Sequence, residues 1–190
     1  MDLFLTIEIV SVILGLIYLI LLIKQNINCW WFGIAASLLS IFLFFNSKLY
    51  SEAILYTYYV FMGFYGYYSW SQTAPNSSGK SGLLISEKGL NFHIQAIGFS
   101  SLVAISLAWV FESFTDASSP YLDAFTTIFS FLATYLEAKK ILSGWIYWIV
   151  INGLTIALYY SKGLDYYSGL AFIYFIMSFV GYLKWKKELV

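Results

Sequence analysis

Residues 28–70 read NCWWFGIAASLLSIFLFFNSKLYSEAILYTYYVFMGFYGYYSW, and residues 143–185 read SGWIYWIVINGLTIALYYSKGLDYYSGLAFIYFIMSFVGYLKW. Aligned at an offset of 115 residues without a gap, the two stretches are identical at 13 of 43 positions. A shared hydrophobic bias does not readily explain the matched tryptophan and glycine pairs, which are Trp30/Trp145, Gly66/Gly181 and Trp70/Trp185. We therefore predict that the chain is an internal duplication.

The composition identifies the environment of this duplicated chain. Of its 190 residues, 61% are hydrophobic and 11% are charged, whereas soluble domains carry about 25% charged residues. The chain is therefore predicted to be an integral membrane protein. The net charge is zero, so no nucleic-acid partner is expected. The single Cys29 and single His93 exclude an internal disulfide and a His-rich metal site, so no metal and no cofactor is expected.

Seven apolar stretches are long enough, or nearly so, to cross a bilayer, which takes about 20 residues. They are continuous rather than alternating, which favours helices over barrel strands. The repeat relates the first three helices to the last three. The predicted fold is thus an all-α integral membrane protein with seven transmembrane helices, arranged as two parallel three-helix repeats joined by a linker helix. The stretches are 5–23, 30–46, 52–70, 92–112, 121–138, 145–161 and 166–184.

This division predicts four parts: a first repeat at 1–70, a polar cytoplasmic loop at 71–91, a linker helix at 92–112 and a second repeat at 121–190. Duplicated bundles with a binding site between the repeats are typical of transporters.

Lysine placement predicts the orientation, because the chain has no arginine. Lysines concentrate in cytoplasmic loops. Eight lysines fall on one side of the predicted spans and two, Lys48 and Lys162, on the other, which places the N-terminus outside and the C-terminus in the cytoplasm. Acidic residues lean toward the outer ends and would enrich cations there: Asp2, Glu8, Glu52, Glu112, Asp116, Asp123 and Asp165.

The strongest candidate site is Trp145-x-x-Trp148-x-x-x-Asn152, whose spacing puts all three side chains on one helix face. Indole faces attract cations, and a carboxamide offers both donors and an acceptor. The set suits a flat heteroaromatic ligand with an amide or amino group. The alternative is an interfacial tryptophan belt, with Asn152 bonded to a neighbouring helix.

Other polar and aromatic residues inside the spans are also candidates for lining a path, because such residues are expensive in lipid. Packing or hydrogen bonds between helices could equally explain them. They are the repeat-equivalent Tyr59 and Tyr174, the helix face formed by Thr127, Ser130 and Thr134, and Trp30 and Ser37, the repeat counterparts of Trp145 and Asn152.

Enzyme chemistry is not predicted. Gly79-Lys80-Ser81 lacks the first glycine of a phosphate-binding loop, because Ala74 stands there, and no strand precedes it. His93 and Cys29 form no plausible nucleophilic set, and His93 is expected to be an interfacial side chain.

These motifs resemble the PnuC family of vitamin-precursor transporters over nearly the whole chain. The similarity is carried by Trp145-x-x-Trp148-x-x-x-Asn152 and by shorter pieces: Gln25-Asn26, Trp30-x-x-Gly33, Thr115-Asp116, Asp123-Ala124 and Lys139-Lys140. The resemblance implies a three-one-three fold and a homotrimer. It also implies substrate contacts from Trp145, Trp148 and Asn152, and facilitated diffusion with trapping by a cytosolic kinase.

The resulting hypothesis is a uniporter in the bacterial inner membrane that imports nicotinamide riboside for NAD synthesis. Thiamine or another vitamin precursor, carried in the same way, is the first alternative. A membrane enzyme or an assembly factor for other membrane proteins is an alternative of another class.

Overall fold

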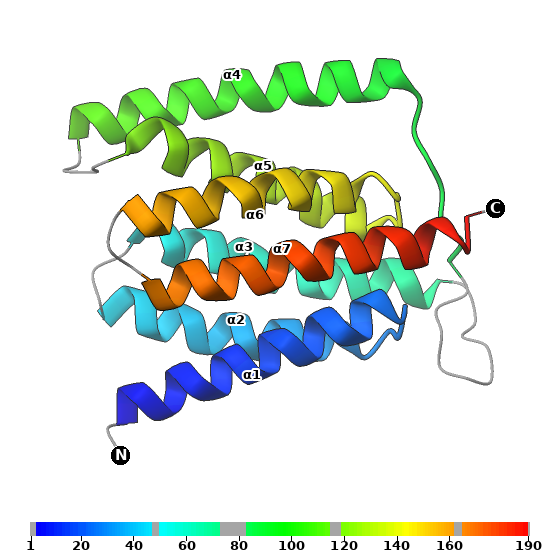
Figure 1. Ribbon diagram of the computed structural model, residues 1–190, viewed down its shortest axis with the longest axis horizontal. Helices are drawn as coiled ribbons and strands as arrows, with labels where there is room; N and C mark the ends of the chain where they lie inside the picture. Colours follow the sequence, from blue (N-terminus) through cyan, green and yellow to red (C-terminus); the bar gives the residue numbers. More distant parts are fainter. Residues whose placement is uncertain (1–2, 47–49, 73–82, 115–118, 162–164, 190) are drawn as a thin grey trace. The chain divides into compact units, whose positions relative to one another are not determined.

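The computed structural model describes residues 3–46, 50–72, 83–114, 119–161 and 165–189, and its regular structure there is all helical (Figure 1). The predicted all-α fold with seven helices is confirmed. Several residues used in the sequence analysis lie outside the described residues: Asp2, Lys48, Ala74, Gly79, Lys80, Ser81, Thr115, Asp116 and Lys162. The helices are α1 Leu3–Ile23, α2 Cys29–Asn46, α3 Tyr50–Ser71, α4 Leu90–Phe114, α5 Pro120–Ala138, α6 Gly144–Ser161 and α7 Asp165–Lys186.

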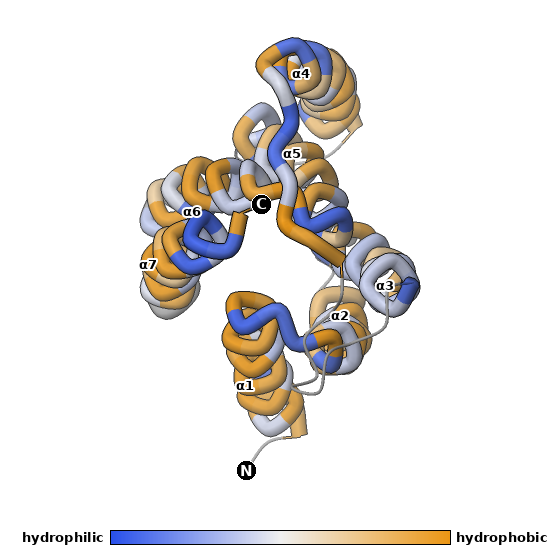
Figure 2. Tube along the Cα trace, turned by 90° about the vertical axis from the view of Figure 1, so that its right-hand side faces the viewer, coloured by the Kyte–Doolittle hydropathy of each residue, from blue (hydrophilic) through white to orange (hydrophobic). Residues whose placement is uncertain are grey.

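Four helical segments in the described part of the chain are long and apolar enough to cross a membrane: Leu3–Ile23, Cys29–Asn46, Leu90–Phe114 and Ser168–Lys186. A further apolar helix, Gly144–Tyr160, is shorter. Helices α3 and α5 do not qualify, because tyrosines lower the hydropathy of α3, and Asp123, Glu137 and several hydroxyl residues lower that of α5. Hydrophobic residues surround α1 on most sides in Figure 2, as expected for a helix in contact with lipid.

The chain divides into two compact units. The first comprises Met1–Leu84 with Ala138–Lys140, and the second comprises Ile85–Glu137 with Ile141–Val190. In the first unit α2 packs against both α1 and α3, and in the second α6 packs against α7. The repeated sequence therefore corresponds to a repeated helix pair, α2–α3 in one unit and α6–α7 in the other.

The same tryptophan–glycine contact holds each of these pairs together. In the first unit Trp30 packs on Gly66, and its ring meets Trp70 edge-on at 5.4 Å and 85°. In the second unit Trp145 packs on Gly181 and meets Trp185 at 5.3 Å and 87°. All four indoles are fully buried. Glycine is required on α3 and α7 because the facing indole occupies the space of a Cβ.

The backbone before each pair is duplicated as well. Gln25 (φ 56°) and Lys140 (φ 50°), 115 residues apart, both adopt the left-handed conformation. Each ends the preceding helix by a turn in which the next amide donates to a carbonyl five residues back: Asn26 to Leu21 at 2.9 Å and Ile141 to Leu136 at 2.8 Å. A non-glycine residue in this conformation is strained by about 1–3 kcal/mol, so side-chain contacts must hold both residues in place.

Those contacts lie in the first unit. The buried Lys140 Nζ donates to Gln25 Oε1 at 2.7 Å and lies 4.5 Å from the centroid of the Trp70 ring. A buried ammonium is tolerated only when it is hydrogen-bonded or paired. The two strained, repeat-equivalent residues therefore stabilise each other.

In the described part of the chain, β structure is limited to isolated bridges. Ser86 pairs with Ile141, and the Leu142 amide donates to the Ser86 carbonyl at 2.9 Å. This pairing holds the segment before α4 against the α5–α6 connection in the second unit.

Candidate functional site

The predicted face of α6 is turned toward the protein. Trp145 is fully buried, Asn152 is buried and Trp148 is partly buried. Ile146 and Val150, on the other side of the helix, are about half exposed. The three side chains therefore share one face of α6, the face turned toward the protein.

Asn152 is positioned by a hydroxyl from the neighbouring helix. Its Nδ2 donates to Ser178 Oγ on α7 at 3.2 Å, and Ser178 Oγ donates in turn to the Tyr174 carbonyl at 2.7 Å. Ser178 is 2% exposed. Within the described residues, the Asn152 Oδ1 accepts no hydrogen bond. Asn152 thus forms the bond to a neighbouring helix that the alternative in the sequence analysis expects. The same bond fixes the orientation of the carboxamide and leaves one acceptor and one N–H available for a ligand.

Two indole N–H groups on the same face also lack partners. Among the described residues, neither Trp145 Nε1 nor Trp148 Nε1 has a hydrogen-bond acceptor, although both atoms are buried. A buried donor without a partner is destabilised by about 1–3 kcal/mol. The indole N–H of Trp30, the repeat counterpart of Trp145, also lacks an acceptor among the described residues. The unpartnered N–H of Trp145 therefore belongs to the packing that the two repeats share. Trp148 is aligned with Gly33 in the repeat, so it has no tryptophan counterpart in the first unit.

Tyr174 lies one turn before Ser178 on α7, and its backbone carbonyl accepts the hydrogen bond from the serine hydroxyl that Asn152 contacts. The threonine hydroxyl groups of α5 bond within their own helix. Thr127 donates to the Asp123 carbonyl at 2.8 Å, and Thr134 donates to the Ser130 carbonyl at 2.8 Å. Ser130 and Thr134 are buried. These bonds satisfy the threonine donors but leave their oxygens able to accept one more hydrogen bond.

The candidates in the first unit are in apolar or aromatic surroundings. Trp30 is enclosed by Gly66, Trp70 and Tyr18. Tyr59 lies among the tyrosines of α3, with its ring 5.4 Å from that of Tyr56.

Ser37, the counterpart of Asn152, is buried on α2. The counterpart of Ser178 is Gly63, and a Cβ there would overlap the Ile34 side chain. The α2–α3 contact is therefore closed by an isoleucine at the level where α6 and α7 carry an amide–hydroxyl pair. The two repeats agree at the tryptophans and differ here, because the amide–hydroxyl pair of α6 and α7 has no counterpart at the equivalent positions Ser37 and Gly63.

Two contacts were missed from the sequence. Ser178 follows no motif, and its only signal is that it replaces a repeat-equivalent glycine. His93 Nδ1, at the start of α4, lies 3.1 Å from Tyr147 Oη on α6. His93 therefore has a protein partner on α6, which its place in the sequence did not indicate. In the described residues, no group of three His, Cys, Asp or Glu side chains is placed to hold a metal ion.

Nearly the whole chain matches a known protein family. The family model described as "Nicotinamide mononucleotide transporter" matches residues 5–187. The chain is 24% identical over 196 residues to the "Nicotinamide riboside transporter PnuC" of Escherichia coli (strain K12), covering 92% of this chain and 81% of that protein.

Two further comparisons extend this context. The chain is 23% identical to the "Riboflavin/roseoflavin transporter RibM" of Streptomyces davaonensis, covering 94% of this chain and 83% of that protein. The structure described as "Crystal structure of the Vitamin B3 transporter PnuC" has the same fold, with a TM-score of 0.78 and 22% identity, over 95% of this chain and 80% of that chain.

Proposed function

We propose, from the premise that the chain belongs to the nicotinamide mononucleotide transporter family, that it is a uniporter importing nicotinamide riboside by facilitated diffusion. It is a multi-pass membrane transporter for a vitamin precursor and not an enzyme. In our proposal, phosphorylation by a cytosolic kinase traps the imported riboside for NAD synthesis. Several relatives are described as nicotinamide riboside transporters, which supports this substrate.

The observation that carries the proposal is the Asn152–Ser178 pair on α6 and α7. A nicotinamide ring bears a carboxamide with one acceptor and two N–H donors, so it can form a paired amide contact with the free edge of Asn152. The ring is a cation in the riboside, which suits the face of Trp148. In the proposal Trp148 and Asn152 contact the ring, and Trp145 supports Trp148 from one turn earlier.

The remaining candidates are proposed as path-lining groups. Hydroxyl oxygens of Thr127, Ser130 and Thr134 would accept hydrogen bonds from the ribose, and Tyr174 would close the end of the site beyond Ser178. Tyr59, Trp30 and Ser37 would line the path from the first repeat. Truncating Thr127, Ser130 or Thr134 should weaken uptake less than truncating Asn152. Trp30 is excluded from this comparison because it also holds α2 to α3.

We further propose a homotrimer in the bacterial inner membrane, divided along the chain into a first repeat at 1–70, a loop at 71–91, a linker helix at 92–112 and a second repeat at 121–190. The N-terminus would be outside and the C-terminus cytoplasmic, because eight of the ten lysines lie on the same side of the predicted spans as the C-terminus. A phosphatase reporter fused after residue 190 should be inactive, and a cytosolic fluorescent reporter there should be active. The reverse pattern would contradict the orientation.

A second substrate has support from one relative and from chemistry. The transporter from Streptomyces davaonensis is described as carrying riboflavin and roseoflavin, and thiamine is also a flat cation with an amino edge. Both could pair with Asn152. Selection among the three compounds must depend on their size and on the contacts around the ring, so their binding has to be compared directly.

The test is calorimetric binding of nicotinamide riboside, thiamine and riboflavin to the purified protein in detergent. We expect binding of the riboside and a roughly ten- to hundredfold loss in Asn152→Ala, because a buried hydrogen bond between ligand and amide is lost. The variant should still fold, since Ser178 keeps its bond to the Tyr174 carbonyl.

The matched control is Ser168→Ala. Ser168 Oγ donates to the Ile156 carbonyl at 3.2 Å and so also joins α7 to α6, but at another level. This variant should bind the riboside as the wild type does. Binding of thiamine or riboflavin alone would reject the substrate, and binding of none of the three by a folded sample would reject the proposed site.

A further inference from the structure

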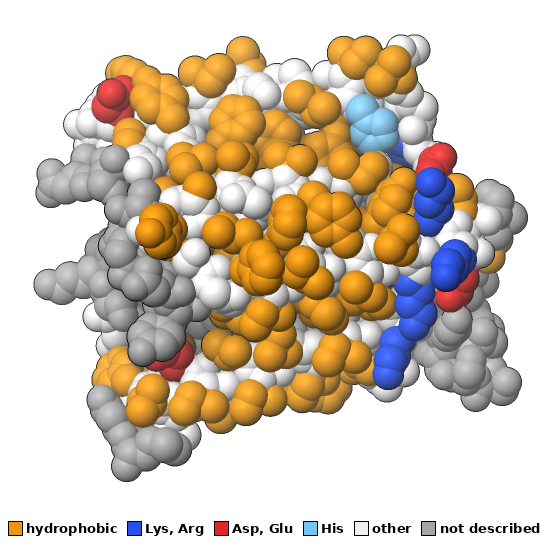
Figure 3. Space-filling model, viewed as in Figure 1, with side chains coloured by type: hydrophobic (Ala, Val, Ile, Leu, Met, Phe, Trp, Pro, Cys, Tyr) orange, Lys and Arg blue, Asp and Glu red, His pale blue; other side chains and the backbone are white. Residues whose placement is uncertain are grey.

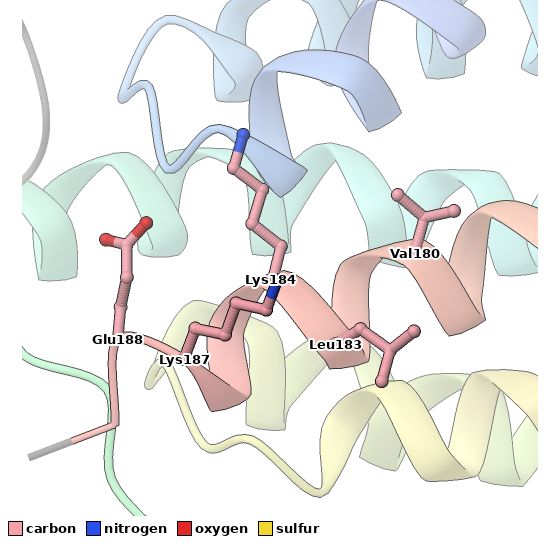
Figure 4. A pocket seen from close by; sticks show the side chains of 5 residues that line it. All are labelled: Val180, Leu183, Lys184, Lys187 and Glu188. Atoms are coloured by element: carbon pink, nitrogen blue, oxygen red, sulfur yellow. The ribbon is translucent and has the colours of Figure 1, made fainter.

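The C-terminal end of α7 carries a surface hollow that has no part in the proposed transport site. It has a volume of about 490 Å³ and is lined by Val180, Leu183, Lys184, Lys187 and Glu188 (Figure 4). This volume falls within the range of about 300–1,000 Å³ that is usual for small-molecule sites.

Four of the lining residues form one face of the helix. Val180, Leu183, Lys184 and Lys187 follow the spacing i, i+3, i+4, i+7, which brings side chains onto the same side. Val180 is 46% exposed and Leu183 is 58% exposed. Gly181, which belongs to the same turns and faces Trp145 on α6, is buried. The hollow therefore lies on the side of α7 turned away from its helix partner.

The charges of the hollow are not neutralised within the described residues. Neither Lys184 nor Lys187 forms an ion pair there. Lys186 points elsewhere, with its Nζ 5.6 Å from the Tyr182 ring. Glu188 lies beyond the end of α7 and opposes only part of the two positive charges. Figure 3 shows lysines at this end of α7 and hydrophobic side chains along its length.

This arrangement matches a lipid rather than a free anion. The apolar segment Ser168–Lys186 ends at these lysines, so the two ammonium groups lie where a membrane-spanning helix meets the headgroups. Basic pockets at this depth bind anionic headgroups. The exposed Val180 and Leu183, nearer the middle of the helix, would contact the acyl chain of the same molecule.

We propose that this hollow binds an anionic phospholipid, with the phosphate between Lys184 and Lys187 and an acyl chain along Val180 and Leu183. An inorganic phosphate ion offers the same anionic oxygens but lacks the chain, so it should bind far more weakly. The alternative role of the lysines is to stabilise the negative end of the helix dipole, which requires no ligand.

The test is the retention of lipid by the purified full-length protein, measured by native mass spectrometry with added phosphatidylglycerol or phosphatidylcholine. We expect preference for phosphatidylglycerol. Because a lysine near the surface contributes about 1 kcal/mol toward an anionic lipid, the double variant Lys184→Gln/Lys187→Gln should lose roughly 30-fold in affinity, or about fivefold per lysine.

Lys186→Gln is the matched control, since it removes the same charge from the same helix end but from outside the hollow. It should retain phosphatidylglycerol within about twofold of the wild type. An equal loss in Lys186→Gln would show attraction by net charge alone and overturn the site. Equal retention of the two lipids, or competition by millimolar inorganic phosphate, would overturn the lipid assignment.

Discussion

Replacing Gly181 with alanine should destabilise the second unit through a single contact. A Cβ at this position would lie 2.5 Å from Trp145 Cζ3 and 2.6 Å from Cε3. Carbon atoms normally approach no closer than about 3.5 Å. The indole has no room to move, because it is fully buried and meets the edge of Trp185 at 5.3 Å. The helices must therefore separate or the ring must leave its preferred rotamer.

The expected size follows from two opposing effects. Overpacking a well-filled interior is destabilising by about 1–3 kcal/mol, and a ring enclosed on all sides should fall at the upper end. Alanine is favoured over glycine in a helix by about 1 kcal/mol. The net loss should be about 2 kcal/mol. For a chain of this size that corresponds to a fall in melting temperature of roughly 4–8 °C.

The assay is thermal unfolding of the detergent-purified protein, followed by tryptophan fluorescence. The matched control is Gly153→Ala on α6, where the nearest atom to the added Cβ, Phe175 Cε2, is 3.5 Å away. This is ordinary contact, so only the gain in helix propensity remains and the melting temperature should stay level or rise.

A double variant tests whether contact with the Trp145 ring causes the loss of stability in Gly181→Ala. Trp145→Phe removes part of the indole, and Trp145→Phe/Gly181→Ala should be more stable than the sum of the single losses predicts. If Gly181→Ala melts like Gly153→Ala, or if the losses in the double variant are additive, the tryptophan–glycine contact does not hold α6 to α7 as described.

Two further predictions concern the polar groups. Ser178→Ala should weaken binding of nicotinamide riboside by roughly three- to tenfold, because Asn152 loses the hydroxyl that fixes its orientation; unchanged calorimetric affinity would contradict this. Lys140→Met should lower the stability of the first unit by about 2 kcal/mol, since it removes a charged hydrogen bond to Gln25 Oε1. A melting temperature equal to that of the wild type would show that this buried ammonium contributes nothing.

The helices could be predicted from sequence because each is a continuous, mostly apolar stretch bounded by polar residues. The repeat also predicted which tryptophans and glycines correspond, and the matched Trp30–Gly66 and Trp145–Gly181 contacts confirm it. A glycine opposite an indole leaves a trace in the sequence, because no other residue fits there.

Contacts between side chains far apart in sequence could not be predicted in the same way. Lys140 looks like one more cytoplasmic lysine in the sequence, but it is buried against Gln25 and Trp70. Ser178 looks like a small residue for close packing, but it orients Asn152. In both cases the three-dimensional packing of a helix end or a helix pair determines the partner. The hydrophobic periodicity of the sequence does not indicate which residue a polar side chain will contact.

The most direct test of transport by uniport is the uptake of labelled nicotinamide riboside into proteoliposomes that contain only this protein. The account predicts that the internal concentration rises to the external one and stops there, with or without a proton or sodium gradient. Accumulation above the external concentration, driven by either gradient, would contradict facilitated diffusion.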